Sequence, residues 1–166
     1  MYLLDTNVVS ELRKIRQGKA DPGVMRWAEG VASSDLYLSV ITVQELEIGI
    51  LLAERRDTGK GKILRFWYEN KVLPVFRHRI LPIDTQISRC SARLHVPNLR
   101  PVRDAFIAAT GIVYGMTVVT RNVRDFEPMG VTLISFYSKK RDKILRFFEI
   151  RLLLQVPVLI GIVLDR

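Results

Sequence analysis

The chain opens with a short apolar run that ends in an acid. Tyr2, Leu3 and Leu4 have the composition of a short buried strand, and Asp5 follows at once. In an open parallel α/β sheet, ligands bind outside the carboxyl ends of the strands, so a carboxylate placed there faces a crevice and not the core. The residues that follow Asp5 suit a turn and the start of a helix. This opening therefore favours an α/β fold with a polar site at the end of its first strand.

Further apolar runs alternate with helical patterns along the rest of the chain. Strands are expected at 36–41, 80–83, 116–120 and 131–134. Helices are expected at 8–15, 24–31, 42–53, 63–75, 85–94 and 102–114. Such alternation predicts a central, mostly parallel sheet flanked by helices.

Some details of this pattern are specific enough to be tested. The charged segment 55–62 contains Gly59 and Gly61 and is expected to be an exposed connection between two helices. In the helix that follows it, the residues expected to point inward are Ile63, Phe66, Trp67 and Val72. Asp84 is expected to cap the helix at 85–94.

The charge of the chain restricts its partners. Among its 166 residues, 26 Lys and Arg stand against 17 Asp and Glu, which gives a net charge of +9 and a pI near 10.1. This balance favours an anionic partner, with nucleic acid first and an acidic protein second. A single cysteine, Cys90, excludes an internal disulfide, and two histidines exclude a His-rich metal site. With no signal-peptide pattern at its start, the chain is expected to be cytoplasmic and to have no membrane partner.

Acidic residues recur where a strand ends or a helix begins: Asp5, Glu45, Asp104 and Asp125. Each has an ordinary structural explanation. Glu45 lies three residues after Thr42, as in a capping box. Asp104 lies in the first turn of a helix, where it would compensate the dipole. Asp125, like Asn122 before it, is a plausible turn or cap residue.

Taken together, the four acids suggest a different role. In a sheet with helical crossovers they can converge on one crevice, where they would raise one another's pKa. A cation among them would relieve the repulsion, and all-oxygen ligands suit Mg²⁺ or Mn²⁺. Such an ion polarises a phosphoryl oxygen and activates water. In a basic protein, this combination points to a phosphodiester of nucleic acid.

Four blocks of the sequence resemble PIN-domain nucleases, and most closely the VapC toxins of bacterial toxin–antitoxin pairs, including their FitB-like branch. The blocks are Leu-Leu-Asp-Thr-Asn at 3–7, Leu-Ser-Val-Ile-Thr-Val-Gln-Glu-Leu at 38–46, Arg-Asp-Ala-Phe-Ile-Ala-Ala at 103–109 and Thr-Arg-Asn-Val-Arg-Asp-Phe at 120–126. The resemblance covers about residues 1–135, in order. It implies a PIN-like fold, a Mg²⁺-dependent endoribonuclease that cuts RNA, a VapB-type antitoxin as partner and a homodimer.

The resemblance also assigns the site. It makes Asp5, Glu45, Asp104 and Asp125 catalytic, with Asp5 and Asp104 as the first metal ligands. Glu45 is a possible further ligand, and either Asp125 or Asn122 would complete the set. Three neighbouring polar residues are expected to support the acids: Thr6, Asn7 and Thr120.

The chain departs from the family pattern after residue 135. We therefore expect a PIN-like domain at 1–138 and a C-terminal extension of unassigned role at 139–166. Within the extension, an amphipathic helix is expected at 144–154, followed by an apolar run at 156–164 that is too short for a comfortable membrane span.

Two other functions compete with a ribonuclease toxin. One is a catalytically inactive PIN module that binds nucleic acid or a protein partner without cleaving. The other is an aspartyl-phosphate phosphatase, since those enzymes also place Asp after an apolar strand. That chemistry normally needs a second Asp two residues later, where this chain has Asn7.

Overall fold

The fold was analysed in a computed structural model, which describes residues 1–136. Five parallel strands form one sheet in the order β3-β2-β1-β4-β5. Their bounds are β1 (Tyr2–Leu4), β2 (Leu36–Ser39), β3 (Ile80–Leu81), β4 (Thr117–Val119) and β5 (Leu133–Ile134). At the centre, Leu4 of β1 is in register with Leu38 of β2 and with Val119 of β4. The predicted parallel sheet flanked by helices is confirmed.

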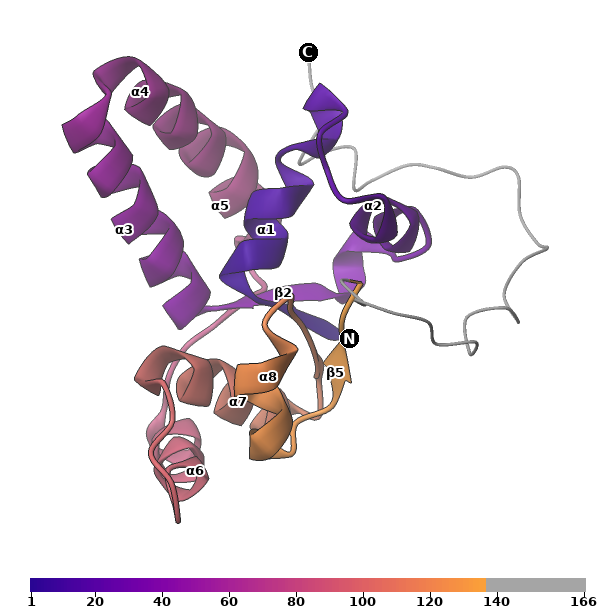
Figure 1. Ribbon diagram of the computed structural model, residues 1–166, viewed down its shortest axis with the longest axis vertical. Helices are drawn as coiled ribbons and strands as arrows, with labels where there is room; N and C mark the ends of the chain where they lie inside the picture. Colours follow the sequence, from indigo (N-terminus) through magenta and orange to yellow (C-terminus); the bar gives the residue numbers. More distant parts are fainter. Residues whose placement is uncertain (137–166) are drawn as a thin grey trace.

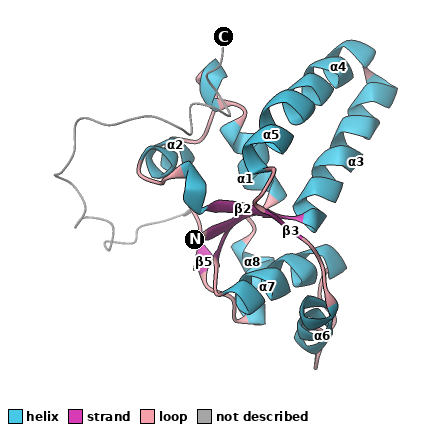
Figure 2. Ribbon diagram, turned by 180° about the vertical axis from the view of Figure 1, so that it is seen from behind, coloured by secondary structure: helices cyan, strands magenta, loops and turns pink. Residues whose placement is uncertain are grey.

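The helices cover both faces of this sheet. They are α1 (Thr6–Leu12), α2 (Pro22–Glu29), α3 (Val40–Arg56), α4 (Thr58–Trp67), α5 (Leu73–Phe76), α6 (Thr85–Leu94), α7 (Val102–Tyr114) and α8 (Val123–Phe126). Figures 1 and 2 show α1, α2 and α5 on one side of the sheet, with α7 and α8 on the other. The same views show α3 and α4 side by side as an antiparallel pair.

The alternation of side chains along β1 separates two apolar cores. Leu4 packs with α1, α2 and α3 in one core, and Leu3 packs with α7 and α8 in the other. Both residues have no exposed surface. Because successive residues of a strand point to opposite faces, three residues are enough to anchor the sheet to both helical layers.

Small residues bring α7 close to β4, as the sequence predicts. Ala105, Ala108 and Ala109 are completely buried. A Cβ added at Gly111 would lie 2.8 Å from Val118 Cγ2, so a larger residue there would push the helix off the sheet. The helix ends at Gly115, whose φ of 61° is left-handed and suits glycine.

The segment 55–62 is exposed except at Gly61, as predicted, but the connection between the two helices is a single residue, Asp57. α3 continues to Arg56, α4 begins at Thr58, and Asp57 between them accepts a hydrogen bond from the Lys60 amide. A Cβ at Gly61 would lie 2.5 Å from Glu54 Cα. This glycine therefore permits close contact between two helices, and a helix cap provides the turn.

The inward face of the following helix was also predicted wrongly in part. Ile63 and Phe66 are 67% and 63% exposed, whereas Tyr68 and Val72 are buried and Trp67 packs against the core from a partly buried position. The face that packs runs through Gly61, Leu64 and Tyr68, and a π-helical turn follows at Tyr68–Val72.

The expected extension at 139–166, with its helix at 144–154, lies outside the described residues. Phe136, the last described residue, contacts the Trp27 ring at a centroid distance of 5.1 Å. Within residues 1–136, no helix is both long enough and apolar enough to cross a membrane.

Candidate active site

The candidate site lies where the strand order reverses. The chain runs outward from β1 through β2 to β3, then returns to the other side of β1 to form β4. The carboxyl ends of β1 and β4 are held together by a 3.0 Å hydrogen bond from the Asp5 amide to the Val119 carbonyl. A reversal of this kind leaves a crevice above the sheet, where ligands of α/β proteins bind. The predicted position of Asp5 at such a crevice agrees with this topology.

Asp5 is a buried acid held by three hydrogen bonds. Its Oδ1 accepts from the Thr6 amide at 2.7 Å, and its Oδ2 accepts from Asn7 Nδ2 at 2.5 Å and from Thr120 Oγ1 at 2.6 Å. Only 5% of its surface is exposed. Burial raises the pKa of Asp5, as does the nearby charge of Glu45, while the three hydrogen bonds act against this rise.

Glu45 is not part of a capping box, which corrects the structural explanation of this residue. α3 begins at Val40, and its N-cap is Ser39, whose hydroxyl accepts from the Ile41 amide. Thr42 lies inside the helix and donates its hydroxyl to the Leu4 carbonyl at 3.1 Å. The carboxylate of Glu45 is thus not used to cap the backbone.

Glu45 instead faces two residues from other elements. Its Oε2 accepts a 2.5 Å hydrogen bond from Thr6 Oγ1, and its Oε1 lies 3.6 Å from Arg103 Nη1. Thr6 follows directly after Asp5, and Arg103 directly precedes Asp104. Glu45 is thereby placed between the two acids expected to be the first metal ligands.

Asp104 lies in the first turn of α7. Its pKa is raised from 3.8 to about 6, first by burial and then by the charges of Asp5, Asp125 and Glu45, with Arg103 acting in the opposite direction. The negative charges of the three other acids thus each act on the Asp104 carboxyl.

Asn122 and Asp125 act as a pair. The Asn122 side-chain amide donates to Asp125 Oδ2, and the Asn122 backbone amide donates to Thr120 Oγ1 at 2.9 Å. Asn7 Oδ1 accepts from the Arg121 amide at 3.0 Å, which joins the opening of the chain to this turn. The three expected supporting residues, Thr6, Asn7 and Thr120, therefore each contact an acid of the crevice.

The donor set suits a hard divalent cation, although the side chains are not arranged around one. Within residues 1–136, no three His, Cys, Asp or Glu side chains lie close enough together to hold a metal ion. The carboxylates are held by Thr6, Thr120, Asn122 and Arg103 instead. Asp5 and Asp104 nevertheless have raised pKa values, and a Mg²⁺ or Mn²⁺ ion bound by oxygen ligands would stabilise their charged forms.

Arg103 was not predicted as a site residue. A cation in the first turn of a helix is unfavourable beside the positive end of the dipole, so its position before Asp104 was a usable signal.

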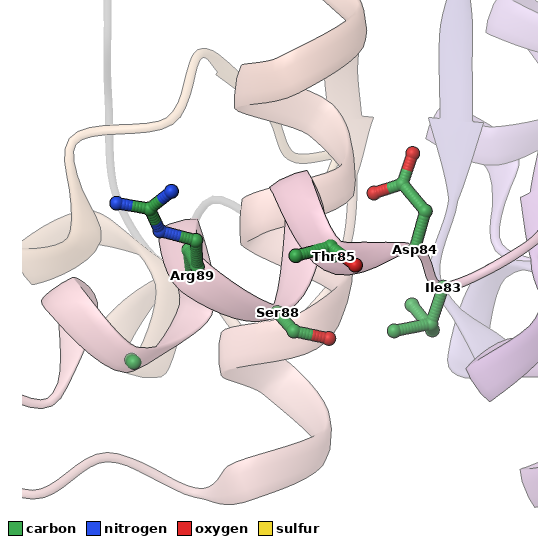
Figure 3. A pocket seen from close by; sticks show the side chains of 6 residues that line it. Ile83, Asp84, Thr85, Ser88 and Arg89 are labelled. Atoms are coloured by element: carbon green, nitrogen blue, oxygen red, sulfur yellow. The ribbon is translucent and has the colours of Figure 1, made fainter.

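An open depression on another part of the surface contains none of the four acids. It is lined by Ile83, Asp84, Thr85, Ser88, Arg89 and Ala92, and Figure 3 shows these side chains along the start of α6. Asp84 Oδ1 accepts from the Ile87 amide at 2.8 Å, which confirms its predicted role as a helix cap. This depression is consequently not the candidate site.

Comparison with known proteins decides the family. A family model described as "PIN domain" matches residues 2–130. The chain belongs to the PIN-domain family. The family resemblance seen in the four sequence blocks is thus confirmed, and the site described above lies within the matched residues.

Two relatives match across most of the domain. "VapC ribonuclease Y4jK" from Sinorhizobium fredii (strain NBRC 101917 / NGR234) is 37% identical over 140 residues, which are 81% of this chain and 96% of the relative. "Toxin FitB" from Neisseria gonorrhoeae (strain ATCC 700825 / FA 1090) is 36% identical over 132 residues, with 76% and 91% covered. Among solved structures, FitAcB from Neisseria gonorrhoeae matches with a TM-score of 0.74 and 32% identity, covering 82% of this chain and 99% of that one.

Proposed function

We propose that this PIN domain is a Mg²⁺-dependent endoribonuclease, which acts as the toxin of a toxin–antitoxin pair. The observation that carries the proposal is the charge around Asp104, whose pKa is raised first by burial and then by three other carboxylates. A fold has no structural need for four acids that repel one another. The relative named VapC ribonuclease supports hydrolysis of RNA as the chemistry.

Asp5 and Asp104 would be the first ligands of the cation, with Mg²⁺ preferred and Mn²⁺ as a substitute. Glu45 and either Asp125 or Asn122 would complete the set with oxygen donors. To bind the cation, Asp125 would have to give up its hydrogen bond with the Asn122 amide, and Glu45 its contact with the Arg103 guanidinium.

The residues around the cation would position the acids and accept a proton. A bound divalent cation supplies polarisation of a phosphoryl oxygen and activation of water. Thr6 holds Glu45 by its Oε2, which leaves Oε1 to accept a proton once Arg103 moves away. Thr120 and Asn7 hold Asp5 so that its carboxylate needs no reorganisation during the reaction.

Cleavage of a labelled RNA tests the proposal directly. The parent protein should cut RNA in Mg²⁺ and stop in EDTA. Asp5→Asn and Asp104→Asn should each lower the rate by about a hundredfold or more while the fold survives. Asp84→Asn is the matched control, because it removes the same charge from a helix cap outside the crevice and asparagine also caps well. If the parent binds RNA without cutting it in Mg²⁺, the chain is an inactive PIN module and the enzymatic proposal is wrong.

We further propose that an antitoxin of the VapB type covers the crevice of the toxin. FitAB, whose structure matches this chain at 31% identity and a TM-score of 0.74, was solved bound to a DNA fragment. A Lys or Arg of the antitoxin would pair with the carboxylates and displace the cation. Expression from the native operon should yield a small second chain that co-purifies with a homodimer of this one, and its addition should stop RNA cleavage. Recovery of this protein alone would contradict the proposal.

A further inference from the structure

Arg103 lies beside the acids of the crevice, and it is loosely held. Its guanidinium approaches Glu45 at 3.6 Å, which is beyond a normal hydrogen bond, and 53% of its side chain is exposed. Glu45 does not depend on it for position, because Thr6 holds the other carboxylate oxygen at 2.5 Å.

Arg65 shows how a structural arginine differs in the same molecule. Its side chain is 24% exposed and bonds to Glu47 at 2.6 Å and to Glu54 at 3.0 Å and 3.1 Å, which ties α4 to α3. Arg103 makes no comparable network among the described residues. Its single long contact and its exposure leave most of its five N–H donors free for a ligand.

The negative charge of the crevice opposes the binding of RNA, and the positive charge of Arg103 could offset part of this repulsion. Four carboxylates repel the phosphodiester on which the proposed nuclease acts, and a divalent cation would neutralise only part of that charge. A guanidinium at the rim binds phosphate through two parallel hydrogen bonds. With a cation among the carboxylates, the attraction of Arg103 to Glu45 weakens and its donors can turn outward.

We propose that Arg103 is a positioning residue with two alternative partners, Glu45 when no divalent cation is bound and a phosphate of the RNA backbone next to the cleaved bond when one is. The proposal rests on the proposed nuclease function. In this proposal Arg103 binds the substrate and takes no part in the reaction itself, which is left to neighbouring acids such as Glu45 and Asp104.

Two measurements with opposite expected signs test this role. In Arg103→Gln, the KM for a labelled single-stranded RNA should rise about tenfold with little change in kcat, because one charged contact to the substrate is lost. Mn²⁺ titrated calorimetrically without RNA should bind about two- to fivefold more tightly, because a competing cation has been removed. Arg103→Lys should restore part of the RNA binding, since lysine keeps the charge but lacks the two-pronged geometry.

Arg93→Gln is the matched control. Arg93 is an exposed arginine of α6 whose Nε donates to the Arg89 carbonyl, so this variant loses the same charge elsewhere on the surface. It should change neither KM nor Mn²⁺ affinity. An unchanged KM in Arg103→Gln, an equal rise in Arg93→Gln, or weaker Mn²⁺ binding in Arg103→Gln would each overturn the proposal.

Failure of the underlying function would look different. A parent protein that never cuts RNA contradicts the nuclease proposal, and Arg103 would then be judged on RNA binding measured against salt. In that case, Arg103→Gln should reduce the slope of log affinity against log salt by about one phosphate contact relative to the parent and to Arg93→Gln. An unchanged slope would overturn the inference independently.

Discussion

Thr120 donates a 2.6 Å hydrogen bond from its buried hydroxyl to Asp5 Oδ2, across 115 positions of the sequence. The bond joins the carboxyl ends of β1 and β4, which lie side by side at the centre of the sheet. It also lowers the pKa of Asp5, against the effect of burial. The site and the fold are therefore coupled through one hydroxyl group.

Removal of the Thr120 hydroxyl should lower the stability of the fold and disturb the site around Asp5. Thr120→Val keeps the shape but leaves Asp5 without one donor and the Asn122 amide without its acceptor. We expect the free energy of unfolding to fall by about 2 kcal/mol and the pKa of Asp5 to rise further. Chemical denaturation at neutral pH measures the first effect. Thr120→Ser keeps the hydroxyl and should lie near the parent, and equal loss in both variants would show that the methyl group matters more.

The raised pKa of Asp104 predicts a pH-dependent stability. Its folded-state pKa of about 6 lies above the ordinary value of 3.8, so the folded protein binds the proton more tightly than the unfolded chain. The charged carboxylate therefore destabilises the cation-free protein at neutral pH, and this penalty disappears as the pH falls from about 6 toward 3.8. Asp104→Asn should raise the melting temperature by a few degrees at pH 7.5, after allowance for the half-exposed position.

The melting difference between Asp104→Asn and the parent should vanish near pH 4 and shrink in millimolar Mg²⁺, which would stabilise only the parent. Thermal melts in EDTA and in Mg²⁺ across this pH range provide the measurement. A lower melting temperature of the variant at pH 7.5 in EDTA would contradict the proposed repulsion.

A substitution at Glu45 should affect catalysis without affecting stability. Glu45→Gln keeps an acceptor for the Thr6 hydroxyl but loses the charge that faces Arg103. We expect cleavage to slow by about a hundredfold or more, with the melting temperature nearly unchanged. Parallel rate and melting measurements decide the matter, and full activity would leave Glu45 without a role in the reaction.

The Mg²⁺ concentration needed for cleavage can show whether Asp125 or Asn122 is a metal ligand, because only Asp125 carries a charge. Asp125→Asn removes a candidate carboxylate ligand and its negative charge from the crevice, so it should increase the Mg²⁺ concentration needed for half-maximal cleavage. Asn122→Ala frees the Asp125 carboxylate from its amide partner and keeps the charge. We expect that variant to need no more Mg²⁺ than the parent. The reverse order would make the Asn122 carbonyl the ligand.

A chain ending at Ser138 should keep the fold and the proposed nuclease activity. All four acids and both apolar cores lie within the described residues, and Phe136 already covers Trp27. Solubility or oligomeric state is what we expect to change, because 156–164 is strongly apolar. Circular dichroism and gel filtration check this, and loss of folding would show that 139–166 belongs to the core.

Much of the fold could be predicted from the sequence because its signals are local. Buried strands are short apolar runs, and the helix of small residues at 102–114 ends at Gly115, as a glycine at this place predicts. The errors arose where local signals have two meanings. Gly61 is a residue type common in loops but serves here as a contact between two helices, and the buried face of the following helix runs through Tyr68 and not through Phe66.

The sequence by itself determined which residues carry charge, which runs are buried and, through four short blocks, the family. Only the tertiary structure decided which partners the acids have and how their pKa values are shifted. Thr42 and Glu45 fit a capping box by spacing, yet the helix begins at Val40, and Thr42 bonds to β1 while Glu45 faces Thr6 and Arg103. The reason is physical: hydrogen-bond partners and pKa depend on distances in space, and parallel strands bring together side chains that are a hundred residues apart.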